Sequence, residues 1–245
     1  MEFTVCLAGT NVAVTSLYNE VYDLCHDYLT VKPAEITVVV TQDDILYEKR
    51  INIREAQIEG LPAYDYSDSY LETLAVYRKI VTNMLEFDTF LMHGAVVAVG
   101  DKAWLFTAPS GTGKTTHINL WLKNIPGSYV VNGDKPLIHI SDECTVYGTP
   151  WSGKEGMNRN VAVKLCGIVC LNRGENNRIE QVSMSKVLPT LIQQSYRPRE
   201  KAKLEKTLSL LSSLGRKIPM YQLYCNMNDE AALIAYNVLS GANHE

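Results

Sequence analysis

The first third of the chain combines strand-like and helix-like patterns of apolar and polar residues. The β-branched run Ile36-Thr37-Val38-Val39-Val40 is typical of a strand, whereas apolar residues recur at helical spacing between Leu74 and Leu85. The elements expected here are strands over 3–14 and 35–41 and helices over 18–25 and 67–86. Residues 43–64 carry no clean period, and Gly60-Leu61-Pro62 indicates a break. We therefore expect residues 1–88 to form an N-terminal α+β lobe.

The part that follows alternates strands and helices around one glycine-rich loop. Residues 89–107 form two apolar runs joined at Gly100-Asp101, a two-residue turn that predicts a β-hairpin. The loop comes directly after this hairpin, and the next helix ends at Pro126-Gly127. The apolar stripe of that helix consists of Ile118, Trp121, Leu122 and Ile125. The remaining elements expected are strands over 129–131, 137–140, 145–147, 161–171 and 220–225, helices over 184–196 and 200–214, the latter ending before Gly215, and a last helix capped by Asn228. Residues 89–245 are therefore expected to form an α/β core in which an antiparallel pair carries the loop.

Composition places the chain among soluble globular proteins, with 46% hydrophobic and 20% charged residues in a length of 245. A net charge of −4 and the lack of any Lys/Arg block give no support to nucleic-acid or membrane partners. The first residues show no secretory leader, and no apolar run reaches the about 18 residues of a membrane span. Six cysteines without a C-x-x-C pair predict buried free thiols. Together these features favour a cytoplasmic protein.

Residues 108–116, Ala-Pro-Ser-Gly-Thr-Gly-Lys-Thr-Thr, carry the most specific chemistry of the chain. They match the Walker A phosphate-binding loop, G-x-x-x-x-G-K-[ST], except that Ala108 stands where the motif has its first glycine. Gly111 and Gly113 allow positive φ, so consecutive N–H groups can point into one concavity. The helix that follows adds free N–H groups and the positive end of its dipole. The stretch therefore predicts a site for the phosphates of a nucleotide.

The individual residues of this loop predict the binding of ATP together with Mg²⁺. Lys114 is expected at the β- and γ-phosphates, and the Thr115 hydroxyl is expected to ligate Mg²⁺. The residues expected to hold the nucleotide are Ser110, Gly111, Thr112, Gly113, Lys114, Thr115 and Thr116. The alternative, a glycine-rich turn before a helix, is disfavoured by the strand that precedes the loop and the amphipathic helix that follows it.

Asp134 ends a short apolar strand beyond the loop, where an acid can ligate Mg²⁺ or take the proton of an attacking hydroxyl. A turn aspartate in Asn-Gly-Asp is the alternative, but the loop upstream favours the functional interpretation. Two histidines lie near these segments. His93, on a predicted strand with apolar neighbours, is interpreted as a hydrogen-bonded structural histidine. His117, just after the loop, is expected to face either phosphate or solvent.

A second glycine-rich stretch, residues 148–156, contains Lys154 and is followed by Arg159. Either cation could reach a transferring phosphate or an anionic acceptor. Glu155 is the alternative general base if Asp134 is committed to the metal. A structural connection anchored by its Pro-Trp pair is an equally good interpretation of this stretch.

Three stretches together resemble the HPr kinase/phosphorylase and phosphoenolpyruvate carboxykinase superfamily. They are His93-Gly94-Ala95-Val96-Val97 with the hairpin it opens, the loop from Ser110 to Thr116, and the strand ending at Asp134. The resemblance covers residues 89–140 well and the rest only in the order of elements. It implies a mixed-sheet P-loop core of the HPr kinase C-terminal or carboxykinase type, ATP-dependent phosphorylation of a hydroxyl, often a serine, and a tendency to form homo-oligomers.

The resemblance departs from the family pattern at one position. The family usually has two adjacent aspartates at Asp134, whereas here the neighbours are Gly133 and Lys135. The leading hypothesis is a P-loop kinase that transfers the γ-phosphoryl group of ATP to a serine hydroxyl in a peptide, a protein or the free amino acid. One alternative is a non-catalytic, nucleotide-dependent binding or regulatory module, which the missing acid supports. Another is a carboxykinase-like enzyme, although the sequence shows no convincing Lys/His metal pair for it.

Overall fold

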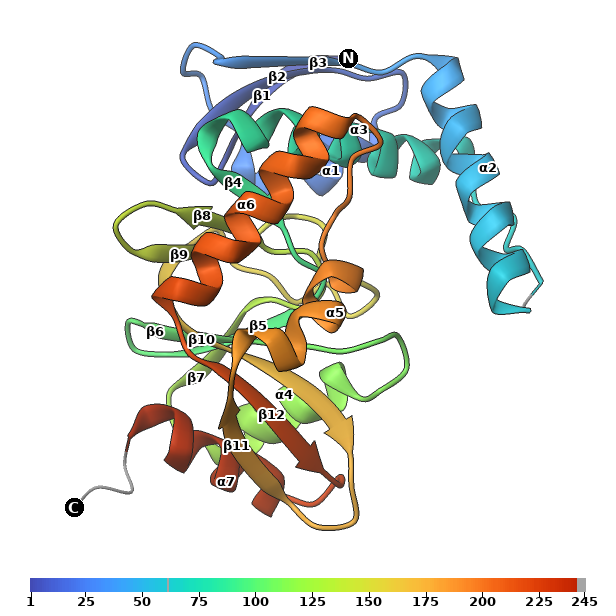
Figure 1. The fold of residues 1–245 in the computed structure, drawn as a ribbon. Helices are drawn as coiled ribbons and strands as arrows, with labels where there is room; N and C mark the ends of the chain where they lie inside the picture. Colours follow the sequence, from blue (N-terminus) through green and yellow to red (C-terminus); the bar gives the residue numbers. More distant parts are fainter. Residues whose placement is uncertain (61, 242–245) are drawn as a thin grey trace. The chain divides into compact units, whose positions relative to one another are not determined.

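The computed structural model describes residues 1–60 and 62–241 of the chain (Figure 1). Its internal contacts divide the protein into two compact units, Met1–Met84 and Leu85–Glu245. The division falls close to the boundary expected at residue 88. Residue 61, in the middle of the predicted break, lies outside the described residues.

The first unit combines a small sheet with helices. Its elements are β1 (Glu2–Leu7), β2 (Thr10–Thr15), α1 (Glu20–Leu24), the 3-10 helix η1 (His26–Tyr28), β3 (Ile36–Val39), α2 (Gln42–Glu59) and α3 (Asp68–Met84). The strands lie in the order β1-β2-β3, with β2 antiparallel to β1 and parallel to β3. The extended segment expected over 3–14 is in fact a hairpin that turns at Ala8 and Gly9, with φ of 48° and 79°. Positive φ at both central residues gives the tight turn whose twist matches that of the flanking strands.

Most of the segment without a clean period, residues 43–64, forms the helix α2, contrary to expectation. A capping box at Thr41 begins this helix, and Gly60, with φ of 67°, ends it. Ile45 is fully buried, but Ile58 is 75% exposed. Because α2 buries so little of its length, no continuous apolar stripe marks it in the sequence.

The second unit contains the remaining strands and helices. They are η2 (Leu85–Phe87), β4 (Thr89–Leu91), β5 (Ala95–Val99), β6 (Lys102–Thr107), α4 (Lys114–Asn124), β7 (Ser128–Asn132), β8 (Leu137–Ile140), β9 (Cys144–Tyr147), β10 (Ala162–Arg173), β11 (Arg178–Val182), α5 (Met184–Gln194), α6 (Lys201–Lys217), β12 (Met220–Cys225) and α7 (Glu230–Ser240). The expected hairpin is confirmed, because β5 and β6 pair antiparallel across the turn at residues 100–101. The glycine-rich loop starts directly after the second strand of this hairpin.

The strands of this unit form a mixed sheet that curls around β10. The sheet runs in the order β4-β8-β9-β10-β6-β5-β7, and β12 joins β10 and β11. On one side β10 pairs with the parallel strand β6. On its other side, residues 162–164 pair with the antiparallel strand β9 and residues 168–173 with the parallel strand β12. Two strands, β9 and β12, thus share one edge of β10, and the sheet is curled. The fold is of the mixed α/β class.

Helices cover both faces of this sheet, as alternate residues of β5 and β6 show. One apolar layer contains Val96 and Leu105 with Leu191 of α5 and Leu211 of α6; the other contains Val97 and Phe106 with Trp121 of α4 and Ala232 of α7. All of these side chains are buried. The strand β6 is therefore fixed on both faces and along both edges, which gives the loop that follows it a rigid base.

Several elements of the second unit differ from the expectation. The residues expected to form the first strand of the hairpin, 89–99, contain two separate strands. Strand β4 pairs with β8, whereas β5 pairs with β6. Strand β11 was not expected, since it is an edge strand with mostly exposed residues and lacks apolar alternation. Helix α6 continues through Gly215, where a side chain would come within 2.7 Å of Met184. The N-cap of α7 is Asp229 rather than Asn228, and Leu122 is 42% exposed rather than part of the apolar stripe.

Within residues 1–60 and 62–241, no helix combines the length and the apolar character needed to cross a membrane. All six cysteines are free, as expected, and four of them are buried: Cys25, Cys144, Cys170 and Cys225. Cys6 and Cys166 are only partly covered.

Candidate functional site

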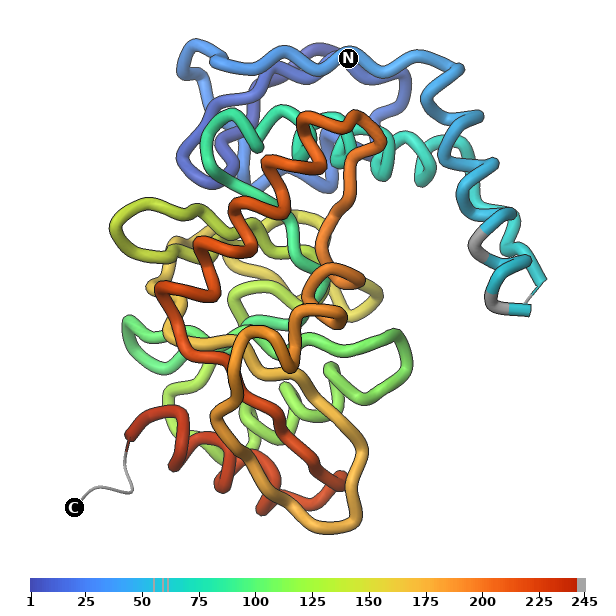
Figure 2. The backbone as a smooth tube through the Cα atoms, viewed as in Figure 1, coloured from blue at the N-terminus to red at the C-terminus, as the bar shows by residue number. Residues whose placement is uncertain are grey.

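The glycine-rich loop bridges the end of β6 and the start of α4, and Figure 2 traces this path through the green part of the chain. Gly111 and Gly113 have φ of 73° and 122°, so the positive φ expected at both positions is confirmed. Ala108, which replaces the first glycine of the motif, is buried in the apolar layer beneath α4. Its methyl group thus packs into the core, which explains how the loop accommodates the departure from the motif.

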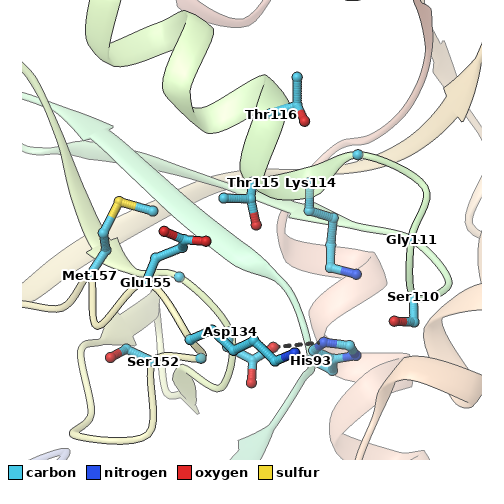
Figure 3. A pocket seen from close by; sticks show the side chains of 14 residues that line it. His93, Ser110, Gly111, Lys114, Thr115, Thr116, Asp134, Ser152, Glu155 and Met157 are labelled. Atoms are coloured by element: carbon cyan, nitrogen blue, oxygen red, sulfur yellow. Dashed lines mark ion pairs between the residues drawn. The ribbon is translucent and has the colours of Figure 1, made fainter.

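A cleft of about 420 Å³ opens beside this loop (Figure 3). It is lined by His93, Ser110, Gly111, Gly113, Lys114, Thr115, Thr116, Gly133, Asp134, Ser152, Gly153, Lys154, Glu155 and Met157. The fold therefore brings together most of the residues that the sequence singles out, from the loop, from the end of β7 and from the second glycine-rich stretch. Lys114, Thr115 and Asp134 present their side chains to the same space (Figure 3).

Two residues expected at the site do not line the cleft. The guanidinium of Arg159 stacks over the ring of Tyr129, 4.8 Å from its centroid, and does not line the cleft. Thr112 donates its hydroxyl to the carbonyl of Pro109, at 2.8 Å, and also lies outside the lining. The expected phosphate contact of Arg159 therefore has no support in this structure, because an aromatic face on β7 holds its side chain.

Lys114 begins α4 and points its ammonium group back toward the loop. The Nζ atom donates a hydrogen bond to the carbonyl of Ala108, at 2.9 Å. Burial lowers the pKa of Lys114 from its ordinary value, and the negative charge of Asp134 partly opposes that shift. The charge of Lys114 thus lies within electrostatic reach of the carboxylate across the cleft.

Asp134 forms an ion pair with His93, with 2.8 Å between Oδ1 and Nε2. Burial by itself would raise the pKa of Asp134, but the hydrogen bond and charge of His93, with the charges of Lys135 and Lys114, lower it below its ordinary value. The carboxylate is 26% exposed and is therefore open to the cleft. Asp134 is held ionised and is accessible from the cleft.

His93 differs from its expected role. It lies in the connection between β4 and β5 rather than on a strand, and it lines the cleft. Its Nδ1 lies 2.9 Å from the amide oxygen of Gln194, a buried residue at the end of α5. Both ring nitrogens of His93 therefore have a hydrogen-bonding partner, Nε2 in Asp134 and Nδ1 in Gln194. His93 is hydrogen-bonded as expected, but it also belongs to the site.

The turn that presents Asp134 is organised by Asn132, a fully buried residue that the sequence interpretation passed over. The Oδ1 atom of Asn132 accepts hydrogen bonds from the backbone N–H groups of Asp134, at 2.8 Å, and Lys135, at 2.7 Å. Its Nδ2 donates to the carbonyl of Thr149, at 2.9 Å. An asparagine two residues before a strand-end aspartate is typical of such a turn, so the sequence did hold a signal for it.

The second glycine-rich stretch forms a tight turn against Asp134. The N–H of Gly156 donates to the carbonyl of Gly153 at 3.2 Å, and Lys154 and Glu155 form the exposed tip. A side chain at Gly153 would lie 3.1 Å from the Cβ atom of Asp134, so the close approach expected of these glycines is present. Trp151 is buried and does not line the cleft.

His117 faces neither phosphate nor solvent, in contrast to the expectation. It is only 2% exposed, and its Nε2 accepts a hydrogen bond from the indole N–H of Trp121, at 3.0 Å. Burial lowers the pKa of His117 to about 4, so the ring is neutral near neutral pH. It packs beside Phe106 on the inner face of α4 and has a structural role.

Comparisons with known proteins add a distant structural likeness. No protein-family model matches the chain, and no curated protein sequence matches it. Among solved structures, the fold is similar to that of the Hpr(Ser) kinase/phosphatase from Coxiella burnetii, with a TM-score of 0.38 and 10% identity. The match covers 62% of this chain and 89% of that chain. A likeness this distant assigns no function, which has to be inferred from the cleft itself.

The lowered pKa of Asp134 predicts how the stability of the protein depends on acid. A carboxylate whose folded-state pKa lies below the ordinary 3.8 stabilises the fold above that value, and the contribution is lost as the pH falls through the lowered pKa. The difference in unfolding free energy between wild type and Asp134→Asn should therefore be largest near neutral pH and shrink under strongly acid conditions. Urea unfolding of both proteins across this range measures it. A difference that stays constant would show that the ionised form gains nothing from its surroundings.

Proposed function

We propose that the protein is an ATP-dependent kinase that transfers the γ-phosphoryl group to a hydroxyl acceptor. The observation that supports this proposal is the meeting, in one cleft, of a phosphate-binding loop with the His93-paired carboxylate of Asp134 (Figure 3). The loop alone suits the binding of phosphate. Phosphoryl transfer also needs a group that ligates the metal or activates the acceptor, and a carboxylate facing the same space can supply it.

The loop side of the cleft suits the polyphosphate of ATP. Helix α4 begins at Lys114, so the backbone N–H groups of its first turn have no partner inside the helix. These groups and the positive end of the helix dipole favour an anion at this point. In the proposal the Lys114 ammonium leaves the Ala108 carbonyl and binds the β- and γ-phosphates, so that it neutralises charge where the transition state develops it.

Mg²⁺ fits the donor atoms on the other side of the loop. The Thr115 hydroxyl and the Asp134 carboxylate supply hard oxygen ligands, and both residues line the cleft. Mg²⁺ is usually held by one or two carboxylates together with the phosphates of the substrate. Residues 1–60 and 62–241 contain no group of three or more His, Cys, Asp and Glu side chains able to hold a metal. When bound, the ion would draw negative charge from the phosphates.

Asp134 is proposed to orient the acceptor hydroxyl and take its proton. In the transfer, a bond forms between the acceptor oxygen and the γ-phosphorus, and the bond from that phosphorus to the bridging oxygen breaks, leaving its electron pair on ADP. Because the transition state is loose, the hydroxyl proton departs late, and a carboxylate of low pKa is basic enough for this role. His93 fixes the direction of the carboxylate through Oδ1. Lys154 and Glu155 lie at the tip of the neighbouring turn and line the cleft. Lys154 is proposed to contact the transferring phosphate, and Glu155 is proposed to serve as the alternative base.

A non-catalytic nucleotide-dependent module is the second candidate function. It is favoured by the single acid at this position, because Asp134 alone would have to serve both the metal and the acceptor proton. In such a module the cleft would bind ATP and change the protein's affinity for a partner without turnover.

The proposal is tested by incubating the protein with Mg-ATP and three kinds of serine acceptor: the free amino acid, serine peptides and a protein substrate. Phosphoryl transfer should be visible as ADP formation together with a phosphorylated acceptor in mass spectrometry. Serine is the acceptor class implied by the sequence resemblance, and a threonine series tests how strictly the hydroxyl is selected. Binding of ATP without any consumption would favour the regulatory module, and failure to bind ATP at all would exclude both functions.

A further inference from the structure

We propose that Arg173 is a positioning residue that sets the shape of the phosphate-binding loop. This inference rests on the proposed nucleotide site and adds a residue outside the loop motif. The guanidinium Nη2 of Arg173 donates to the carbonyl of Gly111, at 2.6 Å, and its Nε lies 3.4 Å from the carbonyl of Thr112, a longer and weaker contact. A cation more than fifty positions along the chain thus holds two consecutive peptide units of the loop.

The sheet explains why Arg173 arrives at this point. Strand β10 runs parallel to β6, with Cys170 opposite Thr107, so the carboxyl ends of both strands meet at one edge of the sheet. The loop leaves from β6 at that edge, and Arg173 is the last residue of β10. The register of two parallel strands therefore places the guanidinium beside the loop, which no local pattern in the sequence reveals.

By holding these carbonyls, Arg173 also fixes the direction of the N–H groups in the same peptide units. In a planar trans peptide the C=O of one residue and the N–H of the next point in opposite directions. With the Thr112 carbonyl turned toward Arg173, the N–H of Gly113 is turned away from it. The N–H of Thr112 is already bonded to the Pro109 carbonyl, at 3.3 Å. Arg173 therefore fixes the direction of the Gly113 N–H by holding the carbonyl of the preceding residue, Thr112.

Gly113 also lines the cleft, and its N–H belongs to the set that would surround phosphate oxygens. In this proposal Arg173 orders the loop before the nucleotide arrives, so less conformational freedom is lost on binding. The fork of a guanidinium can reach two carbonyls at once, whereas the single ammonium group of lysine cannot hold the same pair. A lysine would keep the positive charge near the phosphates but lose this geometry.

Comparing Arg173→Lys with Arg173→Gln distinguishes a positioning role of Arg173 from a general effect of its positive charge. We expect Arg173→Gln to raise the Kd for Mg-ATP about tenfold, as for one lost hydrogen bond from a charged donor. Arg173→Lys should remain close to the glutamine variant rather than to wild type. In the protein without nucleotide, backbone amide exchange across residues 110–113 should become faster in both variants. Because Arg173 is exposed, neither variant should unfold the protein, and thermal unfolding checks this.

Arg178 provides the matched control. It is exposed on strand β11, which pairs with β12 rather than with β10, and its guanidinium lies over the ring of Tyr224, 4.4 Å from the centroid. Arg178→Gln removes the same charge and should leave the affinity unchanged. The inference is overturned if Arg173→Lys binds Mg-ATP like wild type, if Arg178→Gln weakens binding as much as Arg173→Gln, or if loop exchange does not change. If wild type itself fails to bind Mg-ATP, it is the proposed function that fails, and this outcome is distinct from the other three.

Discussion

Replacing Lys114 with alanine is expected to raise the Kd for Mg-ATP by about 10- to 100-fold, the range expected when a charged hydrogen-bond donor to phosphate is lost. The reason is local to the cleft. Lys114 is the partly buried cation at the start of α4, and its Nζ atom is held by the Ala108 carbonyl at 2.9 Å until a stronger acceptor arrives. Titration calorimetry with a non-hydrolysable ATP analogue and Mg²⁺ measures the change without interference from turnover.

Lys123→Ala is the matched control for this experiment. Lys123 lies in the last turn of the same helix, and its 65% exposed side chain pairs with Asp229, with 2.7 Å between Nζ and Oδ2. Removing it subtracts one positive charge from α4 without touching the cleft, so the affinity should stay at the wild-type value. If Lys114→Ala bound the analogue as tightly as wild type, the loop would not be a phosphate site. If both variants weakened binding equally, net charge rather than the cleft would account for the effect.

Asp134→Asn is expected to lower the rate of phosphoryl transfer by about 10²- to 10⁴-fold, the usual contribution of a group that accepts a proton in the transition state. Asparagine keeps the size of the side chain but carries neither the negative charge nor the basicity. Nucleotide affinity should change much less, because the loop supplies most of the phosphate contacts. The two effects separate when the rate at saturating Mg-ATP is compared with the Kd from binding experiments.

Asp142→Asn serves as the control, since Asp142 is an exposed residue in the turn between β8 and β9. His93→Gln adds a second test, because His93 acts through Asp134 by holding its Oδ1 atom. The double variant of His93 and Asp134 should be little worse than Asp134→Asn alone, as expected for residues that work as one unit. Full transfer activity in Asp134→Asn at saturating Mg²⁺ would remove Asp134 from the mechanism and leave Glu155 as the base to examine.

The elements that the sequence predicted well are those that bury apolar residues over most of their length. Helix α3 falls where the apolar periodicity placed it, because burial on one side forces that periodicity. Strand β6 also falls where its apolar run placed it, although it is buried on both faces. Helix α2 and strand β11 were missed for the opposite reason. Both expose most of their residues, so their formation depends on capping or on an adjacent strand rather than on an apolar pattern.

In the candidate site, too, contacts between residues close in sequence could be predicted, whereas contacts between distant residues could not. The stacking of Arg159 could not be read from its neighbours in the chain, because Tyr129 lies on a separate strand. The hydrogen bond between His117 and Trp121 was accessible in principle, since the two residues are four positions apart on one helix. The turn at Asn132 was accessible in principle, since both of its backbone partners lie within three residues.

The sequence by itself determined the conformation of the glycine-rich loop, residues 108–116. The positive φ of its two glycines, the lysine and threonines at the start of a helix, and the strand before it are all set within a few residues, so local patterns suffice to predict them. Only the tertiary structure decided what the loop faces. Asp134, its partner His93 and the supporting Gln194 come from three separate segments, and Arg173 comes from a fourth. They meet because the curled sheet and the helix α5 bring these segments to one edge of the core, and the contacts that fix them span long distances in the sequence.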